Sequence, residues 1–418
     1  MRMQLGPSGL RTRLGAATCL LLGQAATSHA EPADPHWQLD AAGLLYGERG
    51  RTQVFEPTGR LTRFLPNGHV VSLTLGLDTI TGASPTGAIP TTEIHTTTTA
   101  SGRVRTSEQG IVPTSSFQDL RGSADLAWQA PLPGGLATSI GVHVSSEKDY
   151  RSKGADAKLS VPLLQRLATI TVGGGYRYDE VDPTGGTRVP LTSGTIAADH
   201  APNPKRVSTA VLGVSRILTR RWMVALDATR IYERGYLTDP YKVVSQVDPD
   251  TGDPVGELSE RRPSTRDRRD VMASSVFHSD TGIVYASDRW YWDDWGVHSN
   301  TLDLKYRHVL DQYHFLEPHL RYYAQSRADF FRYSLAVGTT LPEFASSDQR
   351  LGSLQSFTLG GTYGIRLPGR PGEWRVRLEY TRQWGKGYPQ DAIGNQRSTD
   401  LSPPVDTGSA AVLYTLRF

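Results

Sequence analysis

The chain has 418 residues, of which 45 are Lys or Arg and 42 are Asp or Glu, giving a formal net charge of +3. No long basic run interrupts this balance, so the composition argues against a nucleic-acid partner. The only cysteine, Cys19, lies close to the N-terminus, and the rest of the chain therefore offers no disulfide, thiolate metal site or cysteine nucleophile.

The first 30 residues have the pattern of a secretory signal peptide. An arginine-containing start precedes an apolar run from about Leu14 to Ala26, and Ser28-His29-Ala30 follows as a small-x-small cleavage sequence. The run is shorter than the roughly 20 residues that a membrane-spanning helix requires. We therefore predict cleavage after Ala30 and an exported domain over residues 31–418.

Alternation with a period of two residues dominates the exported domain. In "VSLTLGLD", for example, Val71, Leu73, Leu75 and Leu77 alternate with polar or small residues. Runs of about 10 residues suit a tilted membrane-spanning strand and exceed the typical globular strand. Weak alternation in the first two strands and in 265–279 leaves fourteen or eighteen strands possible. The sixteen predicted strands are 37–47, 52–65, 69–82, 117–131, 136–148, 154–164, 167–181, 204–218, 221–236, 265–279, 282–292, 297–310, 313–327, 351–367, 373–386 and 407–418.

The links between these strands alternate between short and long. Tight turns such as Pro66-Asn67-Gly68 alternate with longer links, several of them rich in Pro, Thr, Ser and Gly. This arrangement is typical of outer-membrane barrels, with tight periplasmic turns and long extracellular loops. We predict an all-β fold, a transmembrane antiparallel up-and-down β-barrel of about 16 strands in a Gram-negative outer membrane. The longest links are 83–116, 183–203, 237–264, 328–350 and 387–405, of which 83–116 and 237–264 are long enough to fold inward and constrict a channel.

The strand pattern continues to the last residue of the sequence. Val412, Tyr414, Leu416 and Phe418 are apolar at alternate positions. An unpaired strand edge in lipid would leave backbone groups unsatisfied, so we expect the last strand to pair with the first. This ending also resembles the signal by which Gram-negative barrels are recognised, which predicts the barrel-assembly machinery as a partner.

Four separated stretches are distinctive: "DTITGASPTGA" (Asp78 to Ala88), "GYLTDPYKVVS" (Gly235 to Ser245), "YWDDWGVHSNTLDLKYR" (Tyr291 to Arg307) and "LEPHLRYYAQSRADFF" (Leu316 to Phe331). Together they resemble a bacterial family known as domain of unknown function 3570. That resemblance covers essentially the whole exported domain and implies an outer-membrane-type barrel without an established activity. It offers no catalytic residues to transfer to this sequence.

Charged residues on strands 297–310 and 313–327 share the face opposite the apolar one, so we expect them to point into the lumen. A hairpin centred on Gln312 would place Asp303 opposite Arg321, Lys305 opposite His319, and Arg307 opposite Glu317. Such a charge wall is either a selectivity strip for anionic or zwitterionic solutes or a salt-bridged ladder that stiffens the interior. Its predicted members are Asp303, Lys305, Arg307, Glu317, His319, Arg321, Arg366, Arg375, Arg377 and Glu379.

Aromatic residues gather near the predicted strand ends. We interpret them as interfacial girdles, with a carbohydrate-stacking platform as the alternative. The long-loop group is Tyr232, Tyr236, Trp290 to Trp295, Tyr322, Tyr323, Phe330, Phe331, Trp384 and Tyr388, and the tight-turn group is Trp37, Trp128, Trp222 and Trp374.

Three functional hypotheses follow from this sequence. The first is a porin-like channel or export conduit for a small polar solute, the latter working with a periplasmic partner. The second is a non-conducting surface barrel whose loops bind a ligand or protein, and the third is a membrane-embedded hydrolase using His298. The loop with Asp248, Asp250 and Asp253 lacks EF-hand spacing. We expect no catalytic residue, cofactor or metal, and contact with outer-membrane lipid and lipopolysaccharide.

Overall fold

The computed structural model describes residues 35–90, 95–98, 104–107, 111–193, 201–369 and 371–418. The predicted signal peptide, residues 1–30, lies outside the described residues. Within the described ranges, no helix is both long and apolar enough to cross a membrane.

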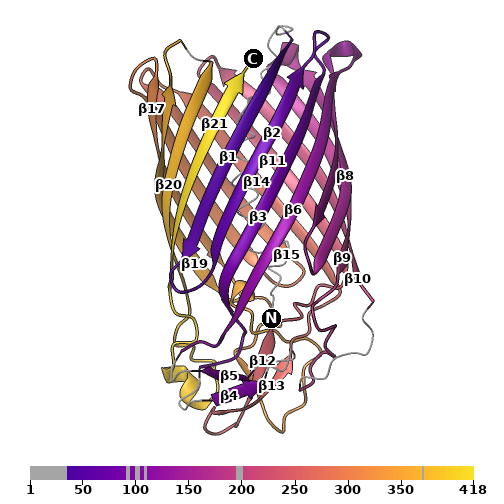
Figure 1. Cartoon of the computed structure of the whole chain (residues 1–418), viewed down its shortest axis with the longest axis vertical. Coiled ribbons are helices and arrows are strands. Elements are labelled where there is room, and N and C mark those ends of the chain that lie inside the picture. The colour runs from indigo at the N-terminus through magenta and orange to yellow at the C-terminus, as the bar shows by residue number, and fades with distance from the viewer. Residues whose placement is uncertain (1–34, 91–94, 99–103, 108–110, 194–200, 370) are drawn as a thin grey trace.

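Sixteen antiparallel strands close into one cylinder, and their order around it follows the sequence (Figure 1). This confirms the predicted up-and-down barrel and selects sixteen strands over fourteen or eighteen. The barrel strands are β1 (His36–Glu48), β2 (Gln53–Phe64), β3 (Val70–Pro85), β6 (Thr114–Pro131), β7 (Ala137–Ser146), β8 (Tyr150–Leu163), β9 (Ala168–Val181), β10 (Asn203–Thr219), β11 (Trp222–Gly235), β14 (Thr265–His278), β15 (Gly282–Asp293), β16 (His298–Val309), β17 (His314–Gln325), β19 (Leu354–Arg366), β20 (Gly372–Gly385) and β21 (Val405–Arg417).

The cylinder closes where the last strand meets the first. β21 pairs with β1 from Arg417 opposite Gln38 to Thr407 opposite Glu48. Beyond the strand itself, the Trp37 N–H donates to the Phe418 carbonyl at 2.7 Å and the Phe418 N–H donates to the Trp37 carbonyl at 2.9 Å. The terminal residue is therefore held by backbone hydrogen bonds, as closure of the barrel requires.

Alternation divides the strands into an apolar outer wall and a polar inner wall. The tight-turn aromatic residues predicted for a girdle, Trp37, Trp128, Trp222 and Trp374, are exposed on the outer wall. At the long-loop end, Tyr232, Trp290 and Tyr322 are exposed as well. The girdle prediction is wrong for Trp295, Phe330 and Phe331, because these three are buried together in an apolar core beyond the strands.

That core belongs to a folded layer of long loops, here called the cap, at the end of the barrel opposite the C-terminus (Figure 1). The cap comprises the described parts of 86–113, 182–202, 236–264, 326–353 and 386–404. A three-stranded sheet in the order β13-β12-β18 forms its centre. Its elements are β4 (His95–Thr98), β5 (Val104–Ser107), β12 (Val243–Val247), β13 (Pro254–Ser259), β18 (Ser334–Ala336), η3 (Gln349–Leu351) and η4 (Gly394–Ser398), while η1 (Pro133–Gly135) and η2 (Leu164–Arg166) lie in tight turns.

The cap crosses the mouth of the barrel. The Ile89 N–H donates to Ser245 Oγ at 3.1 Å, and the Val243 N–H donates to the Thr86 carbonyl at 2.9 Å. One partner follows β3 and the other follows β11, which stands six places further around the ring. A sixteen-stranded cylinder is about 30 Å wide, so these bonds require loops that reach inward over the opening.

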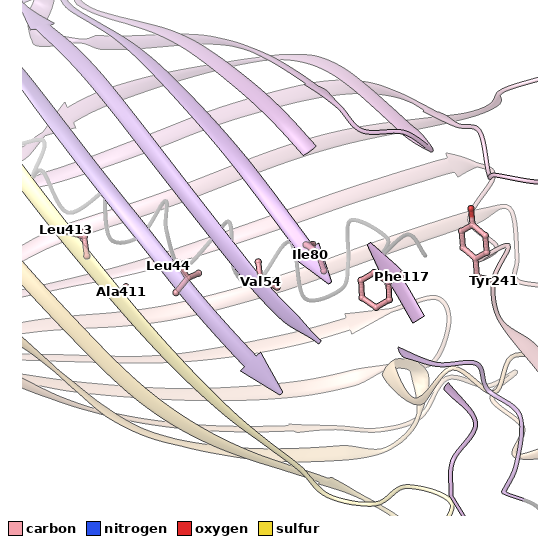
Figure 2. Close-up of a cluster of buried hydrophobic side chains, with 7 residues drawn as sticks. All are labelled: Leu44, Val54, Ile80, Phe117, Tyr241, Ala411 and Leu413. Atoms are coloured by element: carbon pink, nitrogen blue, oxygen red, sulfur yellow. The ribbon is translucent and has the colours of Figure 1, made fainter. Parts of the chain in front are cut away.

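A strip of apolar side chains interrupts the polar inner wall, which the sequence analysis did not anticipate. A cluster of buried side chains runs along the inner faces of β21, β1, β2, β3 and β6 and reaches one tyrosine of the cap (Figure 2). We call it the apolar strip. Its members are Leu44, Val54, Ile80, Phe117, Tyr241, Ala411 and Leu413.

Candidate transport pathway

The predicted charge wall occupies the inner faces of β16, β17, β19 and β20. The register places Asp303 opposite Arg321 and Lys305 opposite His319, as expected for a hairpin centred on Gln312. Arg307 Nε donates to Glu317 Oε2 at 2.7 Å. The predicted register of this hairpin is therefore confirmed.

His319 contacts two carboxylates rather than its register partner Lys305. Its Nδ1 lies 2.7 Å from Glu379 Oε1, and its Nε2 lies 2.9 Å from Asp303 Oδ2. A neutral imidazole carries only one N–H, so the doubly protonated ring satisfies both contacts. Glu379 is on β20, beyond β19, and Gly360 of β19 leaves the space, because a Cβ there would lie 2.5 Å from Glu379 Cγ.

Glu373 completes the wall and was missed by the sequence analysis. Arg366 Nε and Arg375 Nε each donate to one of its carboxylate oxygens at 2.6 Å, and Arg377 Nε lies 3.2 Å from Glu379 Oε1. The alternation from Glu373 to Glu379 would have revealed it. With Glu373 included, the wall holds six Lys or Arg and four carboxylates, an excess of two positive charges before His319 is counted.

Charged pairs also line the inner faces of β2 to β11, on the other side of the lumen. Arg121 Nε donates to Asp78 Oδ2 at 2.6 Å, and Lys205 Nζ lies 3.0 Å from Glu233 Oε1. The sequence analysis did not select this side. By strand alternation its inward carboxylates are Glu56, Asp78, Asp119, Asp125, Asp156, Asp179, Asp227 and Glu233, against Arg60, Arg121, Lys158, Arg177 and Lys205. The lumen is thus positive on one side and negative on the other.

A buried ionic cluster, here called the latch, joins two loops of the cap. Arg262 Nε lies 2.6 Å from Glu260 Oε1, and Arg262 Nη2 lies 2.8 Å from Asp348 Oδ2. Arg350 bonds Asp348 as well and reaches Asp239 Oδ2 at 2.8 Å. Side-chain exposure is 0% for Glu260 and 2% for Asp348. The latch therefore fastens loop 236–264 to loop 326–353.

Lys242 is the sixth member of the latch and ties it to the barrel. Its ammonium donates to Ser84 Oγ at 3.3 Å and to the Pro85 carbonyl at the end of β3. Next to it, the Tyr241 hydroxyl donates to Asp149 Oδ2 at 2.7 Å. Two of the stretches that carry the family resemblance, Asp78 to Ala88 and Gly235 to Ser245, meet at these contacts.

The surroundings shift the pKa values of the latch residues. Burial alone would raise the pKa of Asp348, but Arg350, Lys242 and Arg262 outweigh it and hold that pKa well below its ordinary 3.8. Burial lowers the pKa of Lys242. Burial and the nearby Asp149 carboxylate raise the pKa of Tyr241. Asp348 is accordingly ionised at neutral pH, and its charge is compensated by the cations around it.

The other candidate sites have structural roles. Asp248 Oδ1 accepts the N–H groups of Asp250 and Thr251, each at 2.9 Å, and Asp253 Oδ1 accepts from Asn395 at 2.8 Å. Across the described ranges, no group of three or more His, Cys, Asp or Glu residues is arranged to hold a metal ion. His298 alternates onto the outer wall, away from the lumen.

The sequence matches the family described as "Protein of unknown function (DUF3570)" over residues 11–416. The chain belongs to this family. As a DUF3570 member it shows an antiparallel barrel of sixteen strands. No curated protein sequence matches it.

Solved structures similar to this DUF3570 chain are also β-barrels. The ferric enterobactin receptor PfeA has 10% identity and a TM-score of 0.43, and the match covers 86% of this chain but only 55% of the receptor. The outer membrane protein opdK from Pseudomonas aeruginosa has 9% identity and a TM-score of 0.41, covering 92% of this chain and 99% of that one. A Pseudomonas aeruginosa FadL homologue has 12% identity and a TM-score of 0.37, covering 92% and 89%.

Proposed function

We propose that this protein is a gated channel for small organic anions in the outer membrane of a Gram-negative bacterium. A closed cylinder with an apolar outer wall suits a bilayer, since every backbone group of a closed sheet is paired. Sixteen-stranded barrels enclose a water-filled lumen. The signal peptide would direct export, and the C-terminal strand would engage the barrel-assembly machinery.

The charge wall beside the apolar strip carries the proposal for the solute. Fixed cations such as Arg375 and Arg377 favour anions where a pore narrows, and the apolar strip offers a surface for a hydrocarbon part. Glu373 and Glu379 pair with these two arginines, but the whole wall holds six Lys or Arg against four carboxylates and keeps an excess of two positive charges. The solute that fits both surfaces is a small carboxylate with an apolar portion.

The cap supports a gated channel over a permanently open one. Its loops meet over the mouth and are held by the latch, so solute passage requires the loops to move. Separation of loops 236–264 and 326–353 would open the centre of the cap while leaving the strands paired. Either uptake or export with a periplasmic partner is compatible with this gate.

A second candidate function is a non-conducting surface barrel, and the folded cap is the observation that favours it. A rigid loop layer with its own core presents a defined surface to a ligand or protein. For the hydrolase hypothesis, the outward position of His298 offers no support, and we propose no enzymatic activity.

Planar-bilayer recording of refolded protein in a salt gradient tests the proposal. Wild-type protein should give brief, infrequent current steps, and Arg262→Met, which breaks the latch, should give frequent ones. Both should pass chloride in preference to potassium, and benzoate should reduce the chloride current. A silent bilayer for both variants would instead support the surface barrel, and cation preference would contradict the solute class.

A further inference from the structure

The outer wall carries a broad, open apolar hollow over β10 to β19. It has a volume of about 860 Å³. Small outward residues form part of its floor: Ala273 of β14 lies opposite Leu226 of β11, and Ala286 of β15 lies between Ser275 of β14 and Leu304 of β16. Leu302 and Tyr322 border its other side. The hollow therefore offers apolar surface in the middle of the outer wall.

A second hollow lies nearer the long-loop end on the same strands. It has a volume of about 720 Å³, and its lining differs from that of the first. The outward side chains that line it include Trp290, Trp292, His298, Asn300, Trp384 and Lys386. Indole rings beside amide, imidazole and ammonium groups suit the level of a lipid headgroup.

One hydrogen bond marks the junction of the two hollows. Asn300 Nδ2 donates to Asp288 Oδ1 at 2.6 Å. Asp288 lines the first hollow, here called the lower hollow, and Asn300 lines the second, which is nearer the long loops and is here called the upper hollow. A carboxylate in an apolar belt needs such a partner. The bond holds the Asn300 side chain between the two hollows.

The upper hollow also contains cationic and donor groups that the protein itself does not use. Neither the Lys386 ammonium nor the His298 ring forms a side-chain hydrogen bond with any residue in the described ranges. The Asp391 carboxylate, which interacts electrostatically with Lys386, already forms an ion pair with Arg327. The hollow therefore fits an anionic headgroup.

We propose that these hollows form one groove that binds a single outer-leaflet glycolipid, the lipid A part of lipopolysaccharide. This inference rests on the proposed outer-membrane location. Along β15, Ala286 lies toward the tight turns and Trp292 toward the long loops, so the acyl chains occupy the lower hollow and the sugar-phosphate headgroup the upper one. A lipid of the outer leaflet has the same orientation, with its headgroup toward the extracellular loops. A second protein copy would place an apolar outer wall against Lys386 and leave its charge unpaired.

Native mass spectrometry of the full chain in detergent, with lipid A added, tests the groove. Wild-type protein should retain one lipid A molecule. Lys386→Glu should lower the retained fraction at least tenfold by repelling the phosphates, and Ala286→Leu should lower it similarly by filling the lower hollow. The matched control is Ala410→Leu in a third outer hollow of about 780 Å³ at the β21–β1 seam, which should bind like the wild type.

Three outcomes would overturn the lipid proposal: equal retention by all four proteins, equal retention of phosphatidylglycerol, or dimers in place of lipid adducts. Heat-modifiable gel migration verifies that each variant is folded, and Lys386→Glu changes only a rim residue. Bilayer conductance separates this proposal from the proposed function. A conducting protein without specific lipid retention rejects the groove alone, whereas protein that never inserts into vesicles rejects the membrane location.

Discussion

Ser245 Oγ accepts a hydrogen bond of 3.1 Å from the Ile89 N–H, although the two residues are 156 positions apart and follow strands six places apart in the barrel ring. The bond exists because both loops turn inward over the opening. The same two loops are also joined by the hydrogen bond from the Val243 N–H to the Thr86 carbonyl. Under the proposed channel function, access to the lumen would depend on the stability of the cap more than on the width of the cylinder.

Gly87 lies at the closest approach of these two loops, and its replacement should loosen the cap. Its φ is +95°, and an added Cβ would overlap the Val243 carbonyl oxygen. Gly87→Ala should raise the frequency of bilayer current steps and expose loop 236–264 to protease. Gly134→Ala is the control, since its φ is +78° with no atom within 4 Å of the new Cβ. Both variants carry about 1–2 kcal/mol of strain from the left-handed backbone conformation. Equal effects would therefore show that the clash with the Val243 carbonyl oxygen does not loosen the cap.

Arg262 should be the most sensitive position of the latch. Arg262→Met leaves the buried Glu260 carboxylate without its cation, and loss of one partner from a buried pair costs about 3–5 kcal/mol. Hydrogen exchange of the cap amides should accelerate accordingly, while exchange in the barrel strands stays slow. Arg327→Met removes an exposed pair with Asp391 and should cost at most about 1 kcal/mol. Similar acceleration in both variants would show that the latch does not hold the cap.

Low pH should loosen the cap, because protonation of Asp348 removes a charge that stabilises the latch. Its folded pKa lies well below the ordinary 3.8, so its ionised form stabilises the cap above about pH 4. That stabilisation is lost as the pH falls from the unfolded value through the lower folded value. Bilayer gating should be constant from pH 7 to 5 and become frequent near pH 3. In Asp348→Asn this acid response should shrink, and an unchanged response would exclude Asp348 as its source.

Period-two alternation located most of the barrel strands because each has one face toward the apolar exterior and one toward the lumen. The first two strands and 265–279 alternate weakly, so the sequence alone left fourteen or eighteen strands possible. The cap lacked such a signal. Trp295, Phe330 and Phe331 were assigned to an interfacial girdle because aromatic residues at strand ends satisfy either role. Their burial depends on contacts between loops far apart in the sequence, such as Trp295 against Phe330. No local pattern encodes that association.

The charge wall was predictable only where neighbouring strands form a short hairpin. A turn centred on Gln312 fixes the register, so Arg307 and Glu317 were paired from the sequence. The contact between His319 and Glu379 spans β19 and depends on Gly360 leaving space. The latch joins residues from three stretches, including Asp239 and Arg350, which are 111 positions apart. The His319–Glu379 contact and the latch could not be predicted, because their residues are far apart in the sequence.

Charge reversal on β20 should test the selectivity of the lumen. In the double variant Arg375→Glu and Arg377→Glu, two positive charges are replaced by two negative ones, which changes the net charge of the wall by four units, so reversal potentials in a salt gradient should change from anion to cation preference. Arg382→Glu on the outer face of the same strand should leave the potential unchanged. If the double variant keeps its anion preference, the wall is a stiffening ladder and the selectivity arises elsewhere.

The terminal residue should matter more for assembly than for stability. Phe418→Ala keeps the two backbone hydrogen bonds with Trp37 and removes only an exposed ring, 62% of which is accessible. If the assembly machinery reads the terminal aromatic, as we propose, membrane-inserted protein in cells should fall several-fold, while the unfolding midpoint of detergent-refolded protein stays the same. Deletion of Leu416 to Phe418 removes seam pairing worth about 1 kcal/mol per hydrogen bond and should lower both. Normal cellular insertion of Phe418→Ala would show that the ending is not read as an assembly signal.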